Sequence, residues 1–189
     1  MNNKIDKIFD ESIEIISESK KLVPSIVESV NLIRESLING GKIIAFGNGG
    51  SSSDAQHFVA EFIGRFEKER KSIPAISLTA DSSIITAVGN DYGFERIFER
   101  QCEGLLNKND IVIAISTSGN SQNVLNGVRI AKKMNIKTIG LIGKDGGALG
   151  KMVDVPIIIP SYSTPRIQEA HRIIYHIICE MIEKTIRYD

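Results

Sequence analysis

The amino-acid sequence predicts an α/β fold: a five-stranded, doubly wound parallel sheet in three layers, preceded by a helical extension. Five short apolar runs, rich in β-branched residues, follow residue 41. Runs of this kind are typical of strands buried on both faces of a parallel sheet. The segments between them have helical spacing or loops and are long enough for crossover helices. The five runs lie at 42–46, 74–78, 111–115, 137–142 and 154–159.

Residues 1–40 lack strand signals and predict two helices. Pro24 suits the first turn of the second helix, and Gly40-Gly41 ends it. The first helix carries an apolar stripe, which packs either on its own domain or on a neighbouring subunit. We favour the neighbouring subunit, because an isolated helix must bury such a stripe somewhere. The stripe consists of Ile5, Ile8, Phe9, Ile13 and Ile16.

The composition excludes several classes of protein. Lys+Arg and Asp+Glu both number 23, which argues against a nucleic-acid partner held by bulk electrostatics. The two cysteines, Cys102 and Cys179, form no metal-binding spacing and no disulfide framework. The N-terminus lacks the apolar region of a signal peptide, and no apolar run approaches the roughly 20 residues that span a bilayer. We therefore expect a cytoplasmic protein with no membrane partner.

Two loops of small polar residues follow the first and third predicted strands, at Gly47–Ser53 and Ser116–Ser121. In a flavodoxin-like strand order, these strands flank the point where the order reverses and ligands bind. The second loop offers four hydroxyl groups and leads into a helix near Gln122, which favours a phosphate site over a serine-rich capped turn.

The first loop is glycine-rich but lacks the spacing of a dinucleotide site and the G-K-[ST] ending of a nucleoside-triphosphate loop. Nothing in it supports NAD or ATP. Asn48, Gly49 and Gly50 more simply let the backbone approach a polar ligand closely.

His57 and Glu61 are four residues apart on a predicted helix and share one face. Alone, such a pair is typical of a surface contact worth a few tenths of a kcal/mol. Gln168 and His176 lie on a second predicted helix, where a lone histidine is more often a core residue than a ligand. If both helices border one cleft, the four side chains form a site for zinc or a similar cation, or shuttle protons at a sugar carbonyl. Spacing alone does not establish that convergence.

Six motifs in order along the chain resemble the phosphoheptose isomerase family of sugar isomerase (SIS) domain proteins. They are G-N-G-G-S at 47–51, D-A-Q-H-F-V-A-E at 54–61, A-V-G-N-D-Y-G-F at 87–94, I-S-T-S-G-N-S at 115–121, G-K-D-G-G at 143–147 and R-I-Q-E-A-H at 166–171. The resemblance implies an enzyme that converts sedoheptulose 7-phosphate to D-glycero-D-manno-heptose 7-phosphate through an enediol. That reaction leads to the heptoses of bacterial lipopolysaccharide or capsule.

The resemblance also implies roles for single residues. Glu61 is the general base and His176 the partner acid/base, while Gln168 contacts both the substrate and the metal. One zinc ion per subunit is bound by His57, Glu61, Gln168 and His176. The substrate is bound by Asn48, Gly49, Gly50, Glu61, Asn90, Asp91, Ser116, Thr117, Ser118, Ser121 and Gln168. Arg65 is a further candidate for orienting the sugar.

The family is homotetrameric, so residues 1–40 are expected to serve oligomerisation and residues 41–189 to form the SIS domain. One departure is Pro165, which stands where some members carry an acidic residue, so that residue's role cannot be transferred here.

The chemistry of aldose–ketose isomerisation agrees with the candidate residues independently of the resemblance. Proton removal next to a carbonyl needs a positioned carboxylate, and a cation or an acid must stabilise the developing oxyanion.

Three other readings compete with this one. A non-catalytic SIS protein would lack the carboxylate and the histidine, and both Glu61 and His176 are present. A sugar-phosphate-sensing regulator would append a DNA-binding domain, for which we expect no room in 189 residues. An isomerase for a pentose or hexose phosphate stays open, because a fold alone does not fix a substrate.

Overall fold

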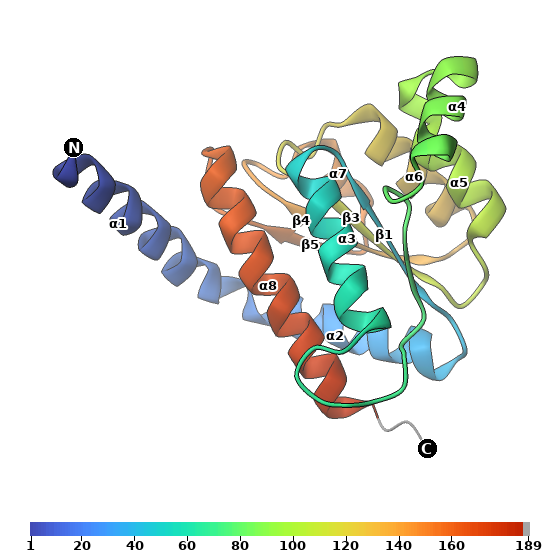
Figure 1. The fold of residues 1–189 in the computed structure, drawn as a ribbon, viewed down its shortest axis with the longest axis horizontal. Helices are drawn as coiled ribbons and strands as arrows, with labels where there is room; N and C mark the ends of the chain where they lie inside the picture. The colour runs from blue at the N-terminus through green and yellow to red at the C-terminus, as the bar shows by residue number, and fades with distance from the viewer. Residues whose placement is uncertain (187–189) are drawn as a thin grey trace.

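The computed structural model describes residues 1–186 and contains one five-stranded, all-parallel sheet (Figure 1). The strand order β2-β1-β3-β4-β5 confirms the predicted doubly wound topology, with its reversal between β1 and β3. All five predicted apolar runs form strands, within a residue or two of the predicted ends. Their bounds are Ile43–Gly47 for β1, Ala75–Ser77 for β2, Ile111–Ser116 for β3, Lys137–Ile142 for β4 and Val155–Ile158 for β5.

Helices cover both faces of the sheet and make the three predicted layers. The helices are α1 (Asn2–Glu18), α2 (Val23–Ile38), α3 (Gly50–Ile63), α4 (Ser82–Tyr92), α5 (Ile97–Leu105), α6 (Gln122–Lys133), α7 (Gly147–Met152) and α8 (Thr164–Thr185). Short 3₁₀ turns, η1 (Ser19–Leu22) and η2 (Phe94–Arg96), precede α2 and α5. One core lies between the sheet and α2, α3 and α8, and a second lies between the sheet and α5, α6 and α7.

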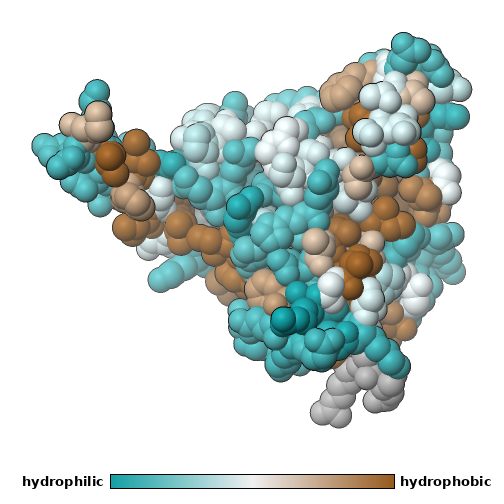
Figure 2. Space-filling model, in the orientation of Figure 1, coloured by the Kyte–Doolittle hydropathy of each residue, from teal (hydrophilic) through white to brown (hydrophobic). Residues whose placement is uncertain are grey.

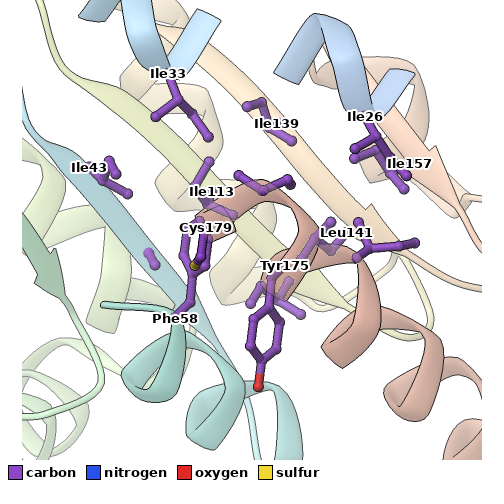
Figure 3. Packing of buried hydrophobic residues seen from close by; sticks show 14 of the residues in the cluster. Ile26, Ile33, Ile43, Phe58, Ile113, Ile139, Leu141, Ile157, Tyr175 and Cys179 are labelled. Carbon is purple, nitrogen blue, oxygen red and sulfur yellow. The ribbon is translucent and has the colours of Figure 1, made fainter. Parts of the chain in front are cut away.

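Alternation along the central strands builds the two cores. In β1, Ile43 and Ala45 face the α3–α8 side, whereas Ile44 and Phe46 face the α5–α6 side. All four side chains are fully buried, as expected for a strand covered on both faces. Tyr175 of α8 belongs to the first core, and its hydroxyl extends from the apolar cluster toward α3 (Figure 3).

The first loop is shorter than the predicted Gly47–Ser53. Helix α3 already begins at Gly50, so Ser51, Ser52 and Ser53 form its first turn. Gly49 precedes the helix with φ +55°, a left-handed conformation that glycine adopts without steric cost. The tight turn thus brings the start of α3 directly to the end of β1.

Helix α1 projects from the body of the protein, and none of its residues is buried in the described chain (Figure 1). Its apolar stripe is open to solvent, with Ile8 50%, Phe9 64% and Ile13 63% exposed (Figure 2). Arg166 of α8 donates a hydrogen bond to the Ile8 carbonyl at 3.2 Å and fixes the course of the helix. The chain itself therefore leaves this stripe uncovered.

Glu183 of α8 holds the segment that follows α3. Its side chain is 4% exposed and accepts hydrogen bonds from three successive backbone N–H groups, those of Phe66, Glu67 and Lys68. Arg70 Nε donates to the same carboxylate at 3.1 Å. Burial alone would raise the pKa of Glu183, but these donors outweigh it and hold the pKa below its ordinary value.

Arg70 in turn closes the C-terminal end of α3. Its guanidinium donates to the carbonyls of Glu61 at 2.6 Å, Phe62 at 2.9 Å and Gly64 at 3.2 Å. The last carbonyls of a helix lack partners within the helix, so the arginine satisfies groups that would otherwise need water. The Arg70–Glu183 ion pair thereby ties the end of α3 to α8.

Among residues 1–186, no helix is long and apolar enough to cross a membrane.

We expect Glu183→Gln to lower the free energy of unfolding by about 3 kcal/mol near neutral pH, because it leaves Arg70 buried without its counter-charge. Glu180→Gln is the matched control: the Glu180–Lys184 pair lies on the same helix but is exposed, so its loss should change stability by less than about 1 kcal/mol. Urea unfolding at several pH values measures both. Equal stability losses for the two variants would contradict the buried role of Glu183.

The pH dependence has a definite sign. A carboxyl group with a depressed folded-state pKa stabilises the protein above its unfolded pKa, about 4.3 for glutamate. The difference between wild type and Glu183→Gln should therefore be complete above about pH 5 and should shrink as the pH falls below about 4.

Candidate active site

The candidate site lies between α3 and α8, which run side by side in the same direction (Figure 1). Gly50 at the start of α3 lies against Gln168 near the start of α8. At the other end, Arg70 and Glu183 join the two helices. The two helices therefore run parallel, and residues of α3 lie beside residues of α8 from the start of α3 to its end.

His57, Glu61 and His176 come together between these helices. One ligand atom from each side chain lies within 4.8 Å of the others. His57 Nε2 is 2.8 Å from Glu61 Oε1, and the rings of His57 and His176 have centroids 5.1 Å apart. The convergence that spacing could not establish is present in the fold for these three residues.

His176 contributes an unused nitrogen to this cluster. Its Nε2 is buried and has no hydrogen-bond partner among the described residues. The pKa of His176 is lower than usual, mainly because burial disfavours the imidazolium and next because His57 is close. A neutral imidazole keeps a lone pair available. Two imidazoles and a carboxylate are ligands that zinc and similar divalent ions prefer, so the three residues fit a metal site.

Three further polar residues, which were not predicted as site residues, are linked by hydrogen bonds to one another and, through Tyr175, to His57. Tyr175 Oη lies 3.0 Å from His57 Nδ1 and 3.5 Å from Asp54 Oδ1. Arg172 Nη2 donates to the same Asp54 oxygen at 3.0 Å. The spacing of Asp54, three residues before His57 on one helix face, is the signal that could have indicated this network.

Gln168 lies at the other end of the helix pair from Glu183. A Cβ atom placed on Gly50 would lie 2.2 Å from Gln168 Nε2, the far end of a flexible side chain, so the amide lies directly against the start of α3. It borders a cavity of about 290 Å³ lined by Gly50, Ser53, Asp54, Pro165, Gln168, Glu169 and Arg172.

The serine loop joins β3 to α6, as predicted. Ser116 Oγ lies 3.3 Å from Ser121 Oγ and accepts a hydrogen bond from Gly119 N at 3.2 Å. The Gly119 carbonyl in turn accepts from Leu149 N of α7 at 2.8 Å, which fixes the loop from outside. Ser121 occupies the N-cap position of α6, but its hydroxyl group makes no capping hydrogen bond to the helix. Thr117 and Ser118 are half-buried in the same loop.

The two loops at the reversal point are joined by a pair of amides. Asn48 and Asn123 exchange two hydrogen bonds, each 2.8 Å long. Asn123 lies on α6 just after the serine loop and was not predicted as a site residue. It holds Asn48 beside the loop that carries the hydroxyl groups, so residues 75 positions apart share one edge of the sheet.

The remaining predicted site residues make their hydrogen bonds and ion pairs with residues outside the cluster of His57, Glu61 and His176. Asn90 and Asp91 are exposed on α4, where the Asn90 amide donates to Asp91 Oδ1 at 2.8 Å. Arg65 is 60% exposed and lies 3.8 Å from Glu69. His171 of α8, which was not predicted as a site residue, belongs to the core: it is fully buried, its Nε2 lies 3.1 Å from the Ile142 carbonyl, and burial lowers its pKa to about 4.

Chemically, the cluster can move protons. Glu61 presents a carboxylate that is 20% exposed, and a ring nitrogen of His176 lies within 4.8 Å of one of its oxygens. A carboxylate and an imidazole this close together can remove and return protons on adjacent atoms of one ligand. The hydroxyl groups and the N-terminus of α6 offer donors to an anion.

Comparisons with known proteins identify the family. A family model described as SIS domain matches residues 8–143. A phosphoheptose isomerase from Geotalea daltonii is 51% identical over 170 residues, covering 90% of this chain and 88% of its own length. The solved structure of phosphoheptose isomerase GmhA from Neisseria gonorrhoeae superimposes with a TM-score of 0.92 at 40% identity, over 97% of this chain and 99% of that one.

A phosphoheptose isomerase structure from Francisella tularensis gives a TM-score of 0.93 at 41% identity, over 97% of this chain and 98% of that one. The two solved structures match 97% of this chain, whereas the SIS-domain match ends at residue 143, before α8. This chain therefore belongs to the phosphoheptose isomerase family of SIS-domain proteins and is a sugar-phosphate isomerase.

Proposed function

We propose that this enzyme converts sedoheptulose 7-phosphate to D-glycero-D-manno-heptose 7-phosphate, in the cytoplasm, for the heptose of a bacterial surface polysaccharide. The observation that carries the proposal is the carboxylate of Glu61 beside two imidazoles, one of them with an unpartnered nitrogen. This set of groups suits proton transfer next to a carbonyl. The relatives named phosphoheptose isomerase support the choice of substrate.

In the proposed reaction, Glu61 removes a proton from C1 of the ketose, and the C1–H electrons form the C1–C2 double bond of an enediol. The same carboxylic acid then returns the proton to C2. His176 moves the hydroxyl proton between the oxygens on C1 and C2, so that the carbonyl passes from C2 to C1. The exchange is balanced, and no other reactant is needed.

The phosphate is assigned to Ser116, Thr117, Ser118 and Ser121, where hydroxyl groups and the N-terminus of α6 favour an anion. Asn48, Gly49 and Gly50 are proposed to shape the seat of the sugar next to that loop. Asn90 and Asp91 are proposed to bind sugar hydroxyls, and Gln168 to contact the substrate. The Asn48–Asn123 amide pair supports a shared site for both loops.

We propose that one zinc ion per subunit is held by His57, Glu61, Gln168 and His176. The buried, unpartnered Nε2 of His176 supports this, because such a nitrogen is destabilising unless something binds it. Gln168, whose amide lies against Gly50, is proposed to join the set by a change of its flexible side chain. When bound, the metal supplies a positive charge that stabilises the developing enediolate oxygen.

We further propose that residues 1–40 assemble the protein into a homotetramer, with residues 41–189 forming the SIS domain. The support is the apolar stripe of α1, which the chain itself leaves open. An exposed apolar face of this kind is typical of an interface.

Metal-stripped protein should bind about one equivalent of zinc per chain, measured by isothermal titration calorimetry. His176→Ala should weaken zinc binding by more than about 100-fold, exceeding the roughly 10–100-fold typical of a lost neighbour of a ligand. Glu69→Gln is the control, because its carboxylate is exposed and lies outside the cluster. Unchanged zinc affinity in His176→Ala would exclude His176 as a ligand.

Glu61→Gln and His176→Gln should each reduce kcat for sedoheptulose 7-phosphate by about 10³-fold or more, because each removes a proton-transfer group. A coupled assay of product formation measures the rate, while circular dichroism checks the fold. Wild-type enzyme should also exchange the C1 proton of the substrate with solvent deuterium, and Glu61→Gln should not. Full turnover by either variant would sink the role given to that residue.

Replacing both Ile8 and Phe9 with Asp should shift the protein from tetramer to smaller species, because the apolar stripe then carries charge. Light scattering coupled to size-exclusion chromatography measures the mass. Lys7→Glu is the control on the opposite, polar face of α1. A tetramer that survives the double substitution would show that α1 does not hold the assembly together.

A further inference from the structure

The second ring nitrogen of His57 meets a buried hydroxyl group. Tyr175 is fully buried, and its Oη lies 3.0 Å from His57 Nδ1. Behind it is Asp54, which is 2% exposed and whose Oδ1 lies 3.5 Å from the same hydroxyl. Arg172 holds Asp54 in place at 3.0 Å. Residues from two helices more than a hundred positions apart in the chain thus form one line of polar groups that ends on the imidazole.

We propose that Tyr175, backed by Asp54, is a positioning residue that fixes the ring of His57 and lets it adopt either neutral tautomer. This inference rests on the proposed metal site, since the second tautomer is the one that leaves Nε2 free for a cation. Tyr175 does not touch the reacting atoms. It acts through His57.

The first tautomer follows from the Glu61 contact. A carboxylate can only accept hydrogen bonds, so a neutral His57 facing Glu61 at 2.8 Å carries its proton on Nε2. Its Nδ1 is then bare and needs a donor, and the Tyr175 hydroxyl is the group within reach. A tyrosine hydroxyl both donates and accepts, so it can supply the proton of that hydrogen bond.

The second tautomer reverses the direction of these hydrogen bonds. When Nε2 binds a cation, the ring proton lies on Nδ1, and solvent exchanges the proton between the two positions. Nδ1–H then donates to Tyr175 Oη, and the hydroxyl proton turns to Asp54 Oδ1. The imidazole is neutral in both arrangements. A hydroxyl group can serve both because it donates and accepts, whereas a phenyl ring can do neither.

The tyrosine ring also constrains both histidines. Its centroid lies 5.5 Å from the His57 ring and 4.7 Å from the His176 ring, each in an edge-to-face arrangement. The Phe58 ring lies 5.8 Å from it between centroids, also edge-to-face. Phenylalanine would preserve this packing, so Tyr175→Phe removes the hydroxyl alone. A tyrosine that serves only the core would leave His57 unaffected by that change.

We expect Tyr175→Phe to stay folded and to bind zinc about 10–100-fold more weakly, the usual effect of losing a partner of a metal-bound histidine. Tyr162→Phe is the matched control, because Tyr162 is 76% exposed. Its zinc affinity should equal that of the wild type. Calorimetry on metal-stripped protein measures all three.

Nitrogen-15 NMR of the imidazoles gives a readout that a purely structural role would not move. In metal-stripped wild type, His57 should show the proton on Nε2 and an accepting Nδ1; with zinc, the proton should lie on Nδ1. Metal-stripped Tyr175→Phe should lose the signature of an accepting Nδ1. Metal-stripped Asp54→Asn should still show the His57 proton on Nε2. It should nevertheless bind zinc more weakly, because the negative charge that accepts the Tyr175 hydroxyl proton in the second tautomer is lost.

The outcomes separate this inference from the proposed reaction. Wild-type zinc affinity together with an unchanged nitrogen-15 pattern in Tyr175→Phe would overturn the role of Tyr175, whatever the substrate is. A wild-type protein that binds zinc but leaves sedoheptulose 7-phosphate unchanged would overturn the reaction and leave the role of Tyr175 standing. Protein that takes up no zinc would overturn both the metal site and the two-tautomer role.

Discussion

The packing of α3 along α8 is the constraint on which the site depends. Charge-assisted hydrogen bonds fix it at two heights: Asp54 with Arg172 and Tyr175 near the first turns, and Arg70 with Glu183 beyond the last turn of α3. Such bonds are stronger than neutral ones, and removing one partner would leave a buried charge unpaired. The helices therefore cannot slide or rotate without breaking one of these contacts, and His57, Glu61 and His176 lie between the two.

The sheet supplies the second constraint. Because β1 and β3 are neighbours, the start of α3 and the start of α6 emerge side by side, and the Asn48–Asn123 pair holds their loops together. The helix that carries the imidazole–carboxylate pair thus begins next to the loop that carries the hydroxyl groups. The strand order alone therefore brings the anion-binding groups and the proton-transfer groups into one region of the molecule.

The sequence was most informative where local patterns decide the structure. Apolar runs that alternate between two cores identified all five strands, and the serine loop was bounded correctly because a strand end and a helix start enclose it. The first loop was predicted too long, since Gly49 allows α3 to begin at Gly50, four residues earlier than the end of the predicted loop would allow.

What the sequence could not predict depends on contacts between distant segments. Tyr175 reads as one more apolar residue of α8 until its hydroxyl meets His57, 118 positions away. Glu183 likewise reads as a surface charge near the end of a helix, yet it is buried by the loop after α3. Gln168 was predicted to lie on the same helix as His176, but the sequence did not indicate that its amide lies against Gly50 at the start of α3.

The cluster itself is poorly explained by folding stability alone. A buried polar atom without a partner costs about 1–3 kcal/mol, and His176 Nε2 is such an atom in the described chain. Phe66 packs near the His176 ring at 5.7 Å and Tyr175 at 4.7 Å, so the imidazole is held in place rather than released to water. An apolar side chain would fill that space without the penalty. A buried nitrogen without a partner, held between neighbouring rings, suits a ligand site, because its lone pair is oriented and shielded from water before the ligand arrives.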